Sequence, residues 1–196
     1  MLRLILGNGY VQMGGRYIGN LERSYLDISL SFATRNDGLL LWQGDQNGDF
    51  IRAGIKDGYL EFASYYDDGK SLMVRSSNRL NDASDHKINI ILQAQNVTLE
   101  VDDRKDGFAE DLSLTNILDV GDYDLFLGGH EDDIADVTDY VFTQGFRGCI
   151  KSIGILHFKI PGTNGPLKYG LANIPLNQDR YVLDRKNMEC VKMCRV

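Results

Sequence analysis

The stretch "GDQNGDF", residues 44–50, places two carboxylates, Asp45 and Asp49, in a tight loop between two apolar stretches. A reverse turn needs Gly and Asn, which tolerate unusual backbone angles, but it does not need carboxylates. Asp49 stands where the second apolar stretch begins, so we expect it to be held more firmly than a residue in the loop. We therefore interpret it either as a charge that keeps the turn hydrated or as one ligand of a metal site.

An all-β fold is expected to position this loop. The chain has 196 residues, of which 43% are hydrophobic and 25% charged, as is typical of one globular domain. Apolar and polar residues alternate in 25–34, 51–56 and 97–102, which is the pattern of half-buried strands. Asx-Gly turn signals separate the strands at 36–38, 56–58, 67–69 and 105–107. With no convincing helix, this pattern predicts an antiparallel β-sandwich or barrel.

The net charge of −7 is unevenly distributed along the chain. Residues 100–140 hold 14 acidic residues and two bases, whereas residues 146–196 hold nine bases and three acids. An acidic zone can serve a cation, and a basic zone can serve an anion. We interpret the run 130–139, with five acids and His130, as a hydrated loop rather than a second cation site. The charge and the lack of a basic-aromatic pattern argue against nucleic-acid binding.

The cysteines and one short motif indicate an oxidising compartment. Cys149, Cys190 and Cys194 fit no zinc pattern, so one disulfide plus one remaining thiol is the simplest interpretation. Asn96 begins the sequon Asn-Val-Thr and is expected near an exposed hairpin tip, where a glycan would fit. No stretch approaches the ~20 apolar residues of a membrane span, so no membrane insertion is expected. We expect a secreted protein segment that belongs to a larger multidomain chain.

Several motifs occur in a characteristic order: "LDISLSFATRNDGLLLWQG", "DFIRAGIKDGYLEF", "VTLEVDD", "DLFLGGH" and "FRGCIKSIGI". Together they resemble the laminin G-like domain, also called the LNS domain, most closely the modules of the perlecan and agrin type. The resemblance implies a jelly-roll-like two-sheet β-sandwich over residues 1–189. Residues 190–196 resemble the start of a following EGF-like module. One departure is that Asp85-His86 stands where the family usually has Trp-His.

The resemblance implies a Ca²⁺ site that would include Asp49, the acid at the end of the loop discussed above. Its side-chain ligands would be Asp49 and Asp119, and its backbone carbonyls those of Tyr66 and Ile117. This chain has one extra residue before "LFLGG", so Asp122 is a possible substitute for Asp119. Two neighbouring carboxylates repel each other unless a cation lies between them, and Ca²⁺ prefers such hard oxygen ligands.

The resemblance also implies a disulfide between Cys149 and Cys190, which would leave Cys194 to the next module. The pairing of Cys149 with Cys194 stays open as an alternative.

The function that the resemblance implies is that of a non-enzymatic extracellular adhesion module of the matrix or basement membrane. It would bind a glycosylated cell-surface receptor of the dystroglycan type, or a matrix protein, across the Ca²⁺ rim. Lys56, Lys70 and Arg75 are candidate basic contacts. Two alternatives are a neurexin-type module that binds a protein receptor, and the binding of sulfated glycans such as heparan sulfate by basic C-terminal residues. A glycosidase would need a paired acid and nucleophile, and no local motif of that kind is present.

Overall fold

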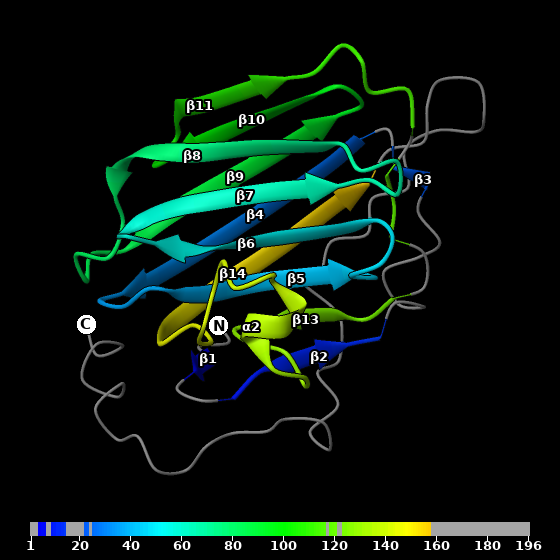
Figure 1. Ribbon diagram of the computed structural model, residues 1–196. Coiled ribbons are helices and arrows are strands. Elements are labelled where there is room, and N and C mark those ends of the chain that lie inside the picture. The colour runs from blue at the N-terminus through cyan, green and yellow to red at the C-terminus, as the bar shows by residue number, and fades with distance from the viewer. Residues whose placement is uncertain are drawn as a thin grey trace.

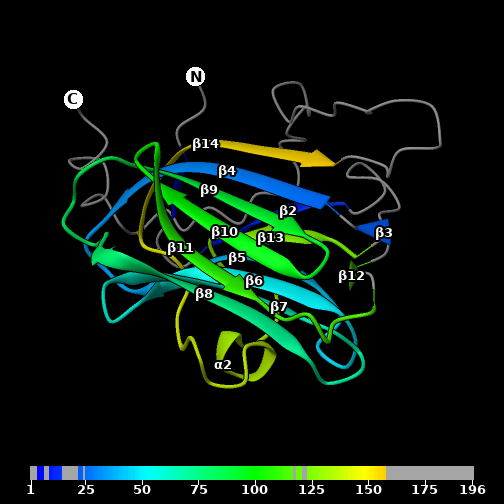
Figure 2. The same ribbon diagram turned by 90° about the horizontal axis from the view of Figure 1, so that it is seen from above.

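The chain folds as two antiparallel β-sheets packed face to face (Figures 1 and 2). The computed structural model describes residues 4–6, 9–14, 22–23, 25–116, 118–120 and 123–157. Within these residues the two large sheets have six strands each, and a third sheet has two short strands. The all-β sandwich predicted from the sequence is confirmed.

The first large sheet has the strand order β1-β14-β4-β9-β10-β11. Its strands are β1 (Leu4–Leu6), β14 (Gly148–His157), β4 (Tyr25–Thr34), β9 (His86–Gln93), β10 (Asn96–Val101) and β11 (Arg104–Glu110). Since β4 pairs with β14 and with β9 along nearly its whole length, the centre of this sheet joins three distant parts of the chain.

The second large sheet has the order β2-β13-β5-β6-β7-β8. Its strands are β2 (Val11–Met13), β13 (Leu125–Leu127), β5 (Gly38–Gly44), β6 (Phe50–Lys56), β7 (Tyr59–Tyr65) and β8 (Ser71–Arg79). The small sheet pairs β12 (Leu118–Asp119) with β3 (Glu22–Arg23). Strands β5 to β8 form a continuous meander, so the loop before β6 and the loop after β7 lie at the same end of the sheet.

The core lies between the two large sheets and follows directly from the period-2 alternation. In β4, the alternating residues Leu26, Ile28, Leu30 and Phe32 are almost fully buried, and the residues between them are mostly half-buried. Side chains of β6, β7, β9 and β10 complete the same apolar cluster. Burial of this many aliphatic side chains makes a stiff scaffold that fixes the strand ends, and with them the loops.

One turn differs from the prediction. The tripeptide Lys-Asp-Gly at 105–107 lies within β11, and the hairpin turns instead at Asp102 and Asp103, both with positive φ. Gly107 is required where β11 approaches β8, because a Cβ there would lie 2.6 Å from Val74 Cγ2. The glycine thus serves a close contact between sheet edges rather than a turn.

The five acids of the run 130–139 are exposed, as expected of a hydrated loop, but the run is more ordered than a loop. It contains a short helix, α2 (Ile134–Val137), which begins with Asp133 as its N-cap. The segment covers a second apolar cluster on the outer face of the β2–β8 sheet, formed by Leu39, Trp42, Phe126 and Phe142. His130 belongs to this cluster, with its ring centroid 4.1 Å from that of Phe126. All seven positions of β5 are therefore buried, because both faces of this strand are covered.

Candidate functional site

The candidate site lies around Asp49, at the end of the sandwich where β6 begins. Its carboxylate accepts two backbone hydrogen bonds: Oδ1 from the N–H of Asp67 at 2.7 Å and Oδ2 from the N–H of Asp119 at 2.6 Å. Asp49 is only 9% exposed. One carboxylate therefore joins the start of β6, the β7–β8 loop and β12, three segments distant in sequence.

The rim is the surface formed by three segments at this end: residues 45–49, residues 66–70, and residues 111–119 apart from residue 117, which lies outside the described part of the chain. The first two are tight turns that the meander places side by side. Asp45 N donates to Asp49 O at 3.0 Å, and Tyr66 N donates to Lys70 O at 3.0 Å. Both turns are thus closed by their own backbone, which fixes the positions of the residues that carry the acidic side chains.

The two acids of the opening stretch have different roles. Asp45 Oδ1 accepts the N–H of Asn47 at 2.9 Å, and its Oδ2 accepts the hydroxyl of Tyr123 at 3.1 Å. Asp45 therefore caps the turn and contacts the segment before β13. Asp49 instead faces the neighbouring loops, so of the two carboxylates it is the one placed to be a ligand.

The electrostatics at Asp49 follow from its burial among other acids. Burial raises the pKa of the Asp49 carboxyl, the N–H groups of Asp119 and Asp67 oppose this, and the negative charges of the same two residues raise the pKa further. The balance is an elevated pKa. A cation at the rim would reverse this effect, because it would stabilise the ionised form.

The residues present fit an oxygen-coordinated cation with sparse protein ligands. Each Asp49 oxygen accepts one N–H, which leaves one lone pair on each, and the Asp119 side chain is exposed at the same place. The carbonyl of Tyr66 accepts the N–H of Gly69 at 2.9 Å and keeps one lone pair. In the described part of the chain, no three carboxylate, imidazole or thiolate side chains converge as in a closed metal site. A cation here would need carbonyl, water or partner oxygens to complete its coordination.

The remaining predicted ligands, Ile117 and Asp122, lie outside the described residues. The structure thus brings together Asp49, Asp119 and Tyr66 as predicted. The assignment of these three residues and Ile117 as metal ligands stays a prediction.

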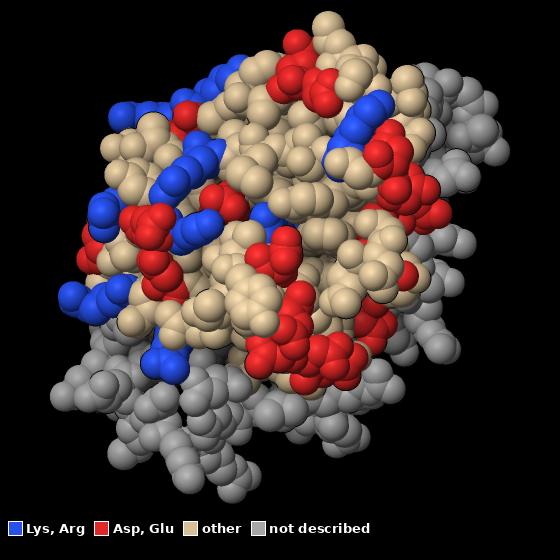
Figure 3. All heavy atoms as spheres, viewed as in Figure 1, with Lys and Arg blue, Asp and Glu red and all other residues tan. Residues whose placement is uncertain are grey.

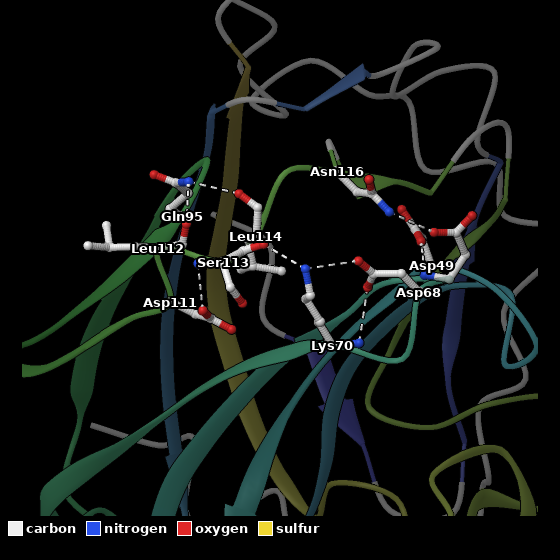
Figure 4. Close-up of polar contacts among 10 residues, drawn as sticks. Asp49, Asp68, Lys70, Gln95, Asp111, Leu112, Ser113, Leu114 and Asn116 are labelled. Atoms are coloured by element: carbon white, nitrogen blue, oxygen red, sulfur yellow. Dashed lines mark hydrogen bonds and ion pairs between the residues drawn. The ribbon is translucent and has the colours of Figure 1, made fainter.

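Two side chains at the rim were not predicted to shape it. Asn116 Nδ2 donates to Asp67 Oδ1 at 3.2 Å, and Lys70 Nζ donates to the carbonyl of Ser113 at 2.6 Å (Figure 4). Lys70 also lies 3.4 Å from Asp68 Oδ2. In the sequence these two residues were marked only by their positions: Asn116 lies close to Asp119, and Lys70 follows the turn at 67–69.

The charges on the outer face of the β2–β8 sheet are unevenly distributed, although acidic side chains also lie among the basic ones on the left of the view (Figure 3). Acidic side chains gather along the lower and right-hand margins of this view, and most Lys and Arg side chains gather on the left. Arg75 Nη2 donates to the carbonyl of Lys56 at 3.2 Å, at the far end of β6 from Asp49. Because the seven residues of β6 span about 20 Å at the usual rise per residue, Lys56 and Arg75 do not belong to the rim. Of the three basic candidates, only Lys70 does.

The other predicted residues lie apart from the rim or outside the described residues. Cys149 is buried in β14, and its predicted partner Cys190 and the alternative Cys194 lie outside the described range. Asn96 is half-buried as the first residue of β10, one position past the tip of its hairpin. Most of the basic C-terminal residues also lie outside the described part. Among the residues that the structure does describe, no helix is long and apolar enough to cross a membrane.

Comparison with known proteins identifies the family of the chain. The family model for the laminin G domain matches residues 32–157. The chain is 31% identical over 173 residues to the basement membrane-specific heparan sulfate proteoglycan core protein of Mus musculus, covering 81% of this chain and 4% of that protein. It is 34% identical over 128 residues to pikachurin of Homo sapiens, covering 60% of this chain and 12% of that protein. The chain thus spans only a small part of these relatives.

Solved structures show the same fold. Domains LG4-5 of the mouse laminin alpha1 chain match with a TM-score of 0.64 and 22% identity, covering 76% of this chain and 39% of that one. The LG1-3 region of the laminin alpha2 chain matches with a TM-score of 0.66 and 18% identity, covering 78% of this chain and 30% of that one. Since the family model covers well over half of the sequence, the chain belongs to the laminin G domain family.

Proposed function

We propose that this chain is an extracellular adhesion module that binds a glycan-bearing receptor of the dystroglycan type through a Ca²⁺ ion held at the rim. The module would bind without catalysing a reaction. The observation that carries the proposal is the position of Asp49, whose buried carboxylate lies against the backbone of both Asp67 and Asp119. The side chains of Asp49 and Asp119 and the carbonyls of Tyr66 and Ile117 would hold the ion.

The sparse ligand set supports a role in binding a partner rather than a purely structural one. When bound, Ca²⁺ would supply a positive centre that takes about six to eight oxygens, of which the chain offers four. The positions left over would be open to hydroxyl or carboxylate oxygens of a glycan. The rim is otherwise strongly acidic. Among its described residues, Lys70 supplies the one basic side chain. Without a cation, this surface would repel an acidic glycan.

Isothermal calorimetry tests the cation part of the proposal. We expect the wild-type chain to bind Ca²⁺ with a dissociation constant of about 10⁻⁴ to 10⁻³ M, the general range of extracellular Ca²⁺ sites. The Asp49→Asn, Asp119→Asn double variant should lose this binding, whereas Glu131→Gln, which removes a charge outside the rim, should keep it. No heat of binding for the wild type, or equal binding by the double variant, would refute the proposal.

A binding assay on immobilised, glycosylated α-dystroglycan tests the receptor part. We expect retention in Ca²⁺ and release by a chelator, and no retention of the double variant. Enzymatic removal of the receptor's glycans should abolish binding. If binding survives deglycosylation, the partner is a protein surface and the neurexin-type alternative applies. If binding survives chelation, the rim is not the docking surface.

A further inference from the structure

The third segment of the rim, residues 111–116 and 118–119, does not pair with the described strands of either large sheet. Side chains from other turns bind it instead. After β11 the chain leaves the sandwich edge at Asp111, and among the described residues β12 pairs with the two residues of β3. Leu114 is 2% exposed and packs in the core, whereas Leu112 is 71% exposed. The turn itself is closed by the Leu114 N–H on the carbonyl of Asp111 at 3.1 Å and by the Ser113 N–H on Asp111 Oδ1 at 2.8 Å, so what it needs from outside is partners for its carbonyls.

Three consecutive carbonyls of this segment accept hydrogen bonds from side chains of two other turns (Figure 4). Gln95 Nε2, in the β9–β10 turn, donates to the carbonyls of Leu112 at 3.1 Å and Leu114 at 2.8 Å. Lys70 Nζ donates to the carbonyl of Ser113, which lies between them. The backbone N–H of Asp111 returns a bond to the carbonyl of Gln95 at 2.9 Å. Gln95 and Lys70 thus hold both sides of one short turn.

The same segment continues directly to the rim. Asn116 contacts Asp67, and a few residues later Asp119 donates its N–H to Asp49. A displacement of residues 111–116 would therefore be transmitted to Asp119 over a very short length of chain. We propose that Gln95 and Lys70 are positioning residues: they hold the segment 111–116 so that Asp119 lies against Asp49, although neither touches Asp49 or Asp119. The effect on cation affinity rests on the proposed function, but the effect on Asp119 does not.

Lys70 permits a test in which two roles predict opposite signs. If Lys70 acts only as a nearby positive charge, its removal should strengthen the binding of a cation at the rim. If it positions the segment, its removal should weaken that binding. Gln95 is neutral, so its replacement changes position without changing charge.

Hydrogen–deuterium exchange of single amides, measured by NMR on the chain without added cation, tests the positioning role. The variants are Gln95→Leu, which keeps the shape and loses both donors, and Lys70→Met. In each we expect exchange of the Leu114 and Asp119 N–H groups to accelerate about fivefold, the factor for the loss of about one net hydrogen bond. The amides of β6 should keep their rates, which separates this effect from a general loss of stability.

Matched controls use the same chemical changes elsewhere. Gln93→Leu alters an exposed glutamine on β9, two positions before Gln95. Lys105→Met removes the same charge at the opposite end of the sandwich. Both should leave the Asp119 rate unchanged, and Lys70→Arg should largely restore it, because a guanidinium can still donate to Ser113. Faster exchange at Leu114 with no change at Asp119 would overturn the inference, and so would no change at either amide.

Calorimetry with Ca²⁺ adds the second readout. We expect the affinity to fall about tenfold in Gln95→Leu and in Lys70→Met, the lower end of the range for the loss of a group that orients a ligand, and to be unchanged in Lys105→Met. Tighter binding by Lys70→Met would show that Lys70 acts only by its charge. If the wild-type chain binds no Ca²⁺, the proposed function fails, and the exchange at Asp119 still decides the positioning role.

Discussion

Asp49 and Asp119 are 70 positions apart in the chain, and the carboxylate of the first accepts the backbone N–H of the second at 2.6 Å. This bond joins β6, in the middle of one large sheet, to the short strand β12 at the end of the sandwich. The contact has a structural role whether or not an ion is bound, because it satisfies a backbone donor with a buried acceptor. The stability of the rim and its proposed binding role therefore depend on the same side chain.

We expect Asp49→Ala to lower the free energy of unfolding by about 2–4 kcal/mol, because two backbone donors lose a charged acceptor. Burial, and after it the charges of neighbouring acids, raise the pKa of Asp49. Because its ionised form is therefore disfavoured in the fold, we expect the loss of stability to be no larger than this. Urea unfolding without added cation measures it. Glu131→Ala, an exposed acid outside the rim, should stay within about 0.5 kcal/mol of wild type. A loss of the same small size for Asp49→Ala would contradict the structural role.

Arg52 anchors the acidic segment over the second apolar cluster, and its replacement should be costly. Its side chain is 3% exposed, and it donates to the carbonyl of Thr138 at 2.9 Å and to the hydroxyl of Tyr65 at 2.7 Å. Its Nη2 also lies 4.0 Å from Glu61 Oε1. Arg52→Met should destabilise the fold by about 3–5 kcal/mol, because Glu61 is left buried without a counter-charge.

A double-mutant cycle separates two effects: the loss of the contacts of Arg52, and the loss of the counter-charge of Glu61. Glu61→Leu in the Arg52→Met background should recover part of the lost stability, since the uncompensated charge is removed. If the double variant is as unstable as the sum of the two single variants, the two side chains are not coupled.

His86 should make the fold more stable at mildly acidic pH. Its Nδ1 lies 3.0 Å from Asp102 Oδ2, and its Nε2 lies 3.1 Å from Asp82 Oδ1. Burial alone would lower the pKa of His86, but the hydrogen bonds and charges of Asp102 and Asp82 outweigh it and raise the pKa above the ordinary 6.5. The stabilisation is full below pH 6.5 and is lost as the pH rises through the pKa of the folded state.

The measurement is the free energy of unfolding of wild type and His86→Gln as a function of pH. The difference between the two proteins should be larger at about pH 6 than at about pH 8. An NMR titration of the His86 ring should place its midpoint above that of an unstructured histidine. A lower midpoint would mean that burial, not the two carboxylates, dominates.

His130 should have the opposite pH dependence. Its side chain is 6% exposed among Trp42 and Phe126, and burial lowers its pKa below 6.5, although Asp132 and Glu131 oppose the shift. The folded state keeps the ring neutral, so stability is lost as the pH falls below 6.5 and the unfolded chain takes up a proton. His130→Phe keeps the aromatic contacts and should remove this loss, as thermal unfolding between about pH 5 and 7 would show. An unchanged acid dependence would contradict the assignment.

The sequence was most informative where structure depends on local alternation. The stretch 25–34 reads apolar-polar throughout, and β4 has the predicted bounds. The tripeptide Lys-Asp-Gly was informative at only one of its two positions. At 56–58 it forms a turn with positive φ at Asp57 and Gly58, and at 105–107 it is part of a strand. The same three residues adopt two structures because the packing of β11 against β8, which no local pattern encodes, decides the second.

The rim shows the same division. The resemblance of the motifs was enough to name Asp49, Asp119 and Tyr66 together, but it did not reveal which neighbours hold them. Asp67 binds Asp49 through its backbone N–H, Asn116 binds the side chain of Asp67, and Gln95 binds backbone carbonyls. All three act on distant segments, so their residue types and spacing carry no signal in the linear chain. Likewise, the acids of 130–139 indicated a hydrated loop, whereas the residues between them cover Trp42 and Phe126.

The sequence alone determined the all-β class, the main strands and the acids at their ends, because period-2 alternation and turn residues act between near neighbours. Only the tertiary structure decided that Asp49 lies against Asp119, that Lys70 and Gln95 hold the segment between them, and that Lys56 and Arg75 lie elsewhere. Those relationships depend on how two sheets stack and on which loops meet at one end, and such long-range contacts are set by the packing of the whole core.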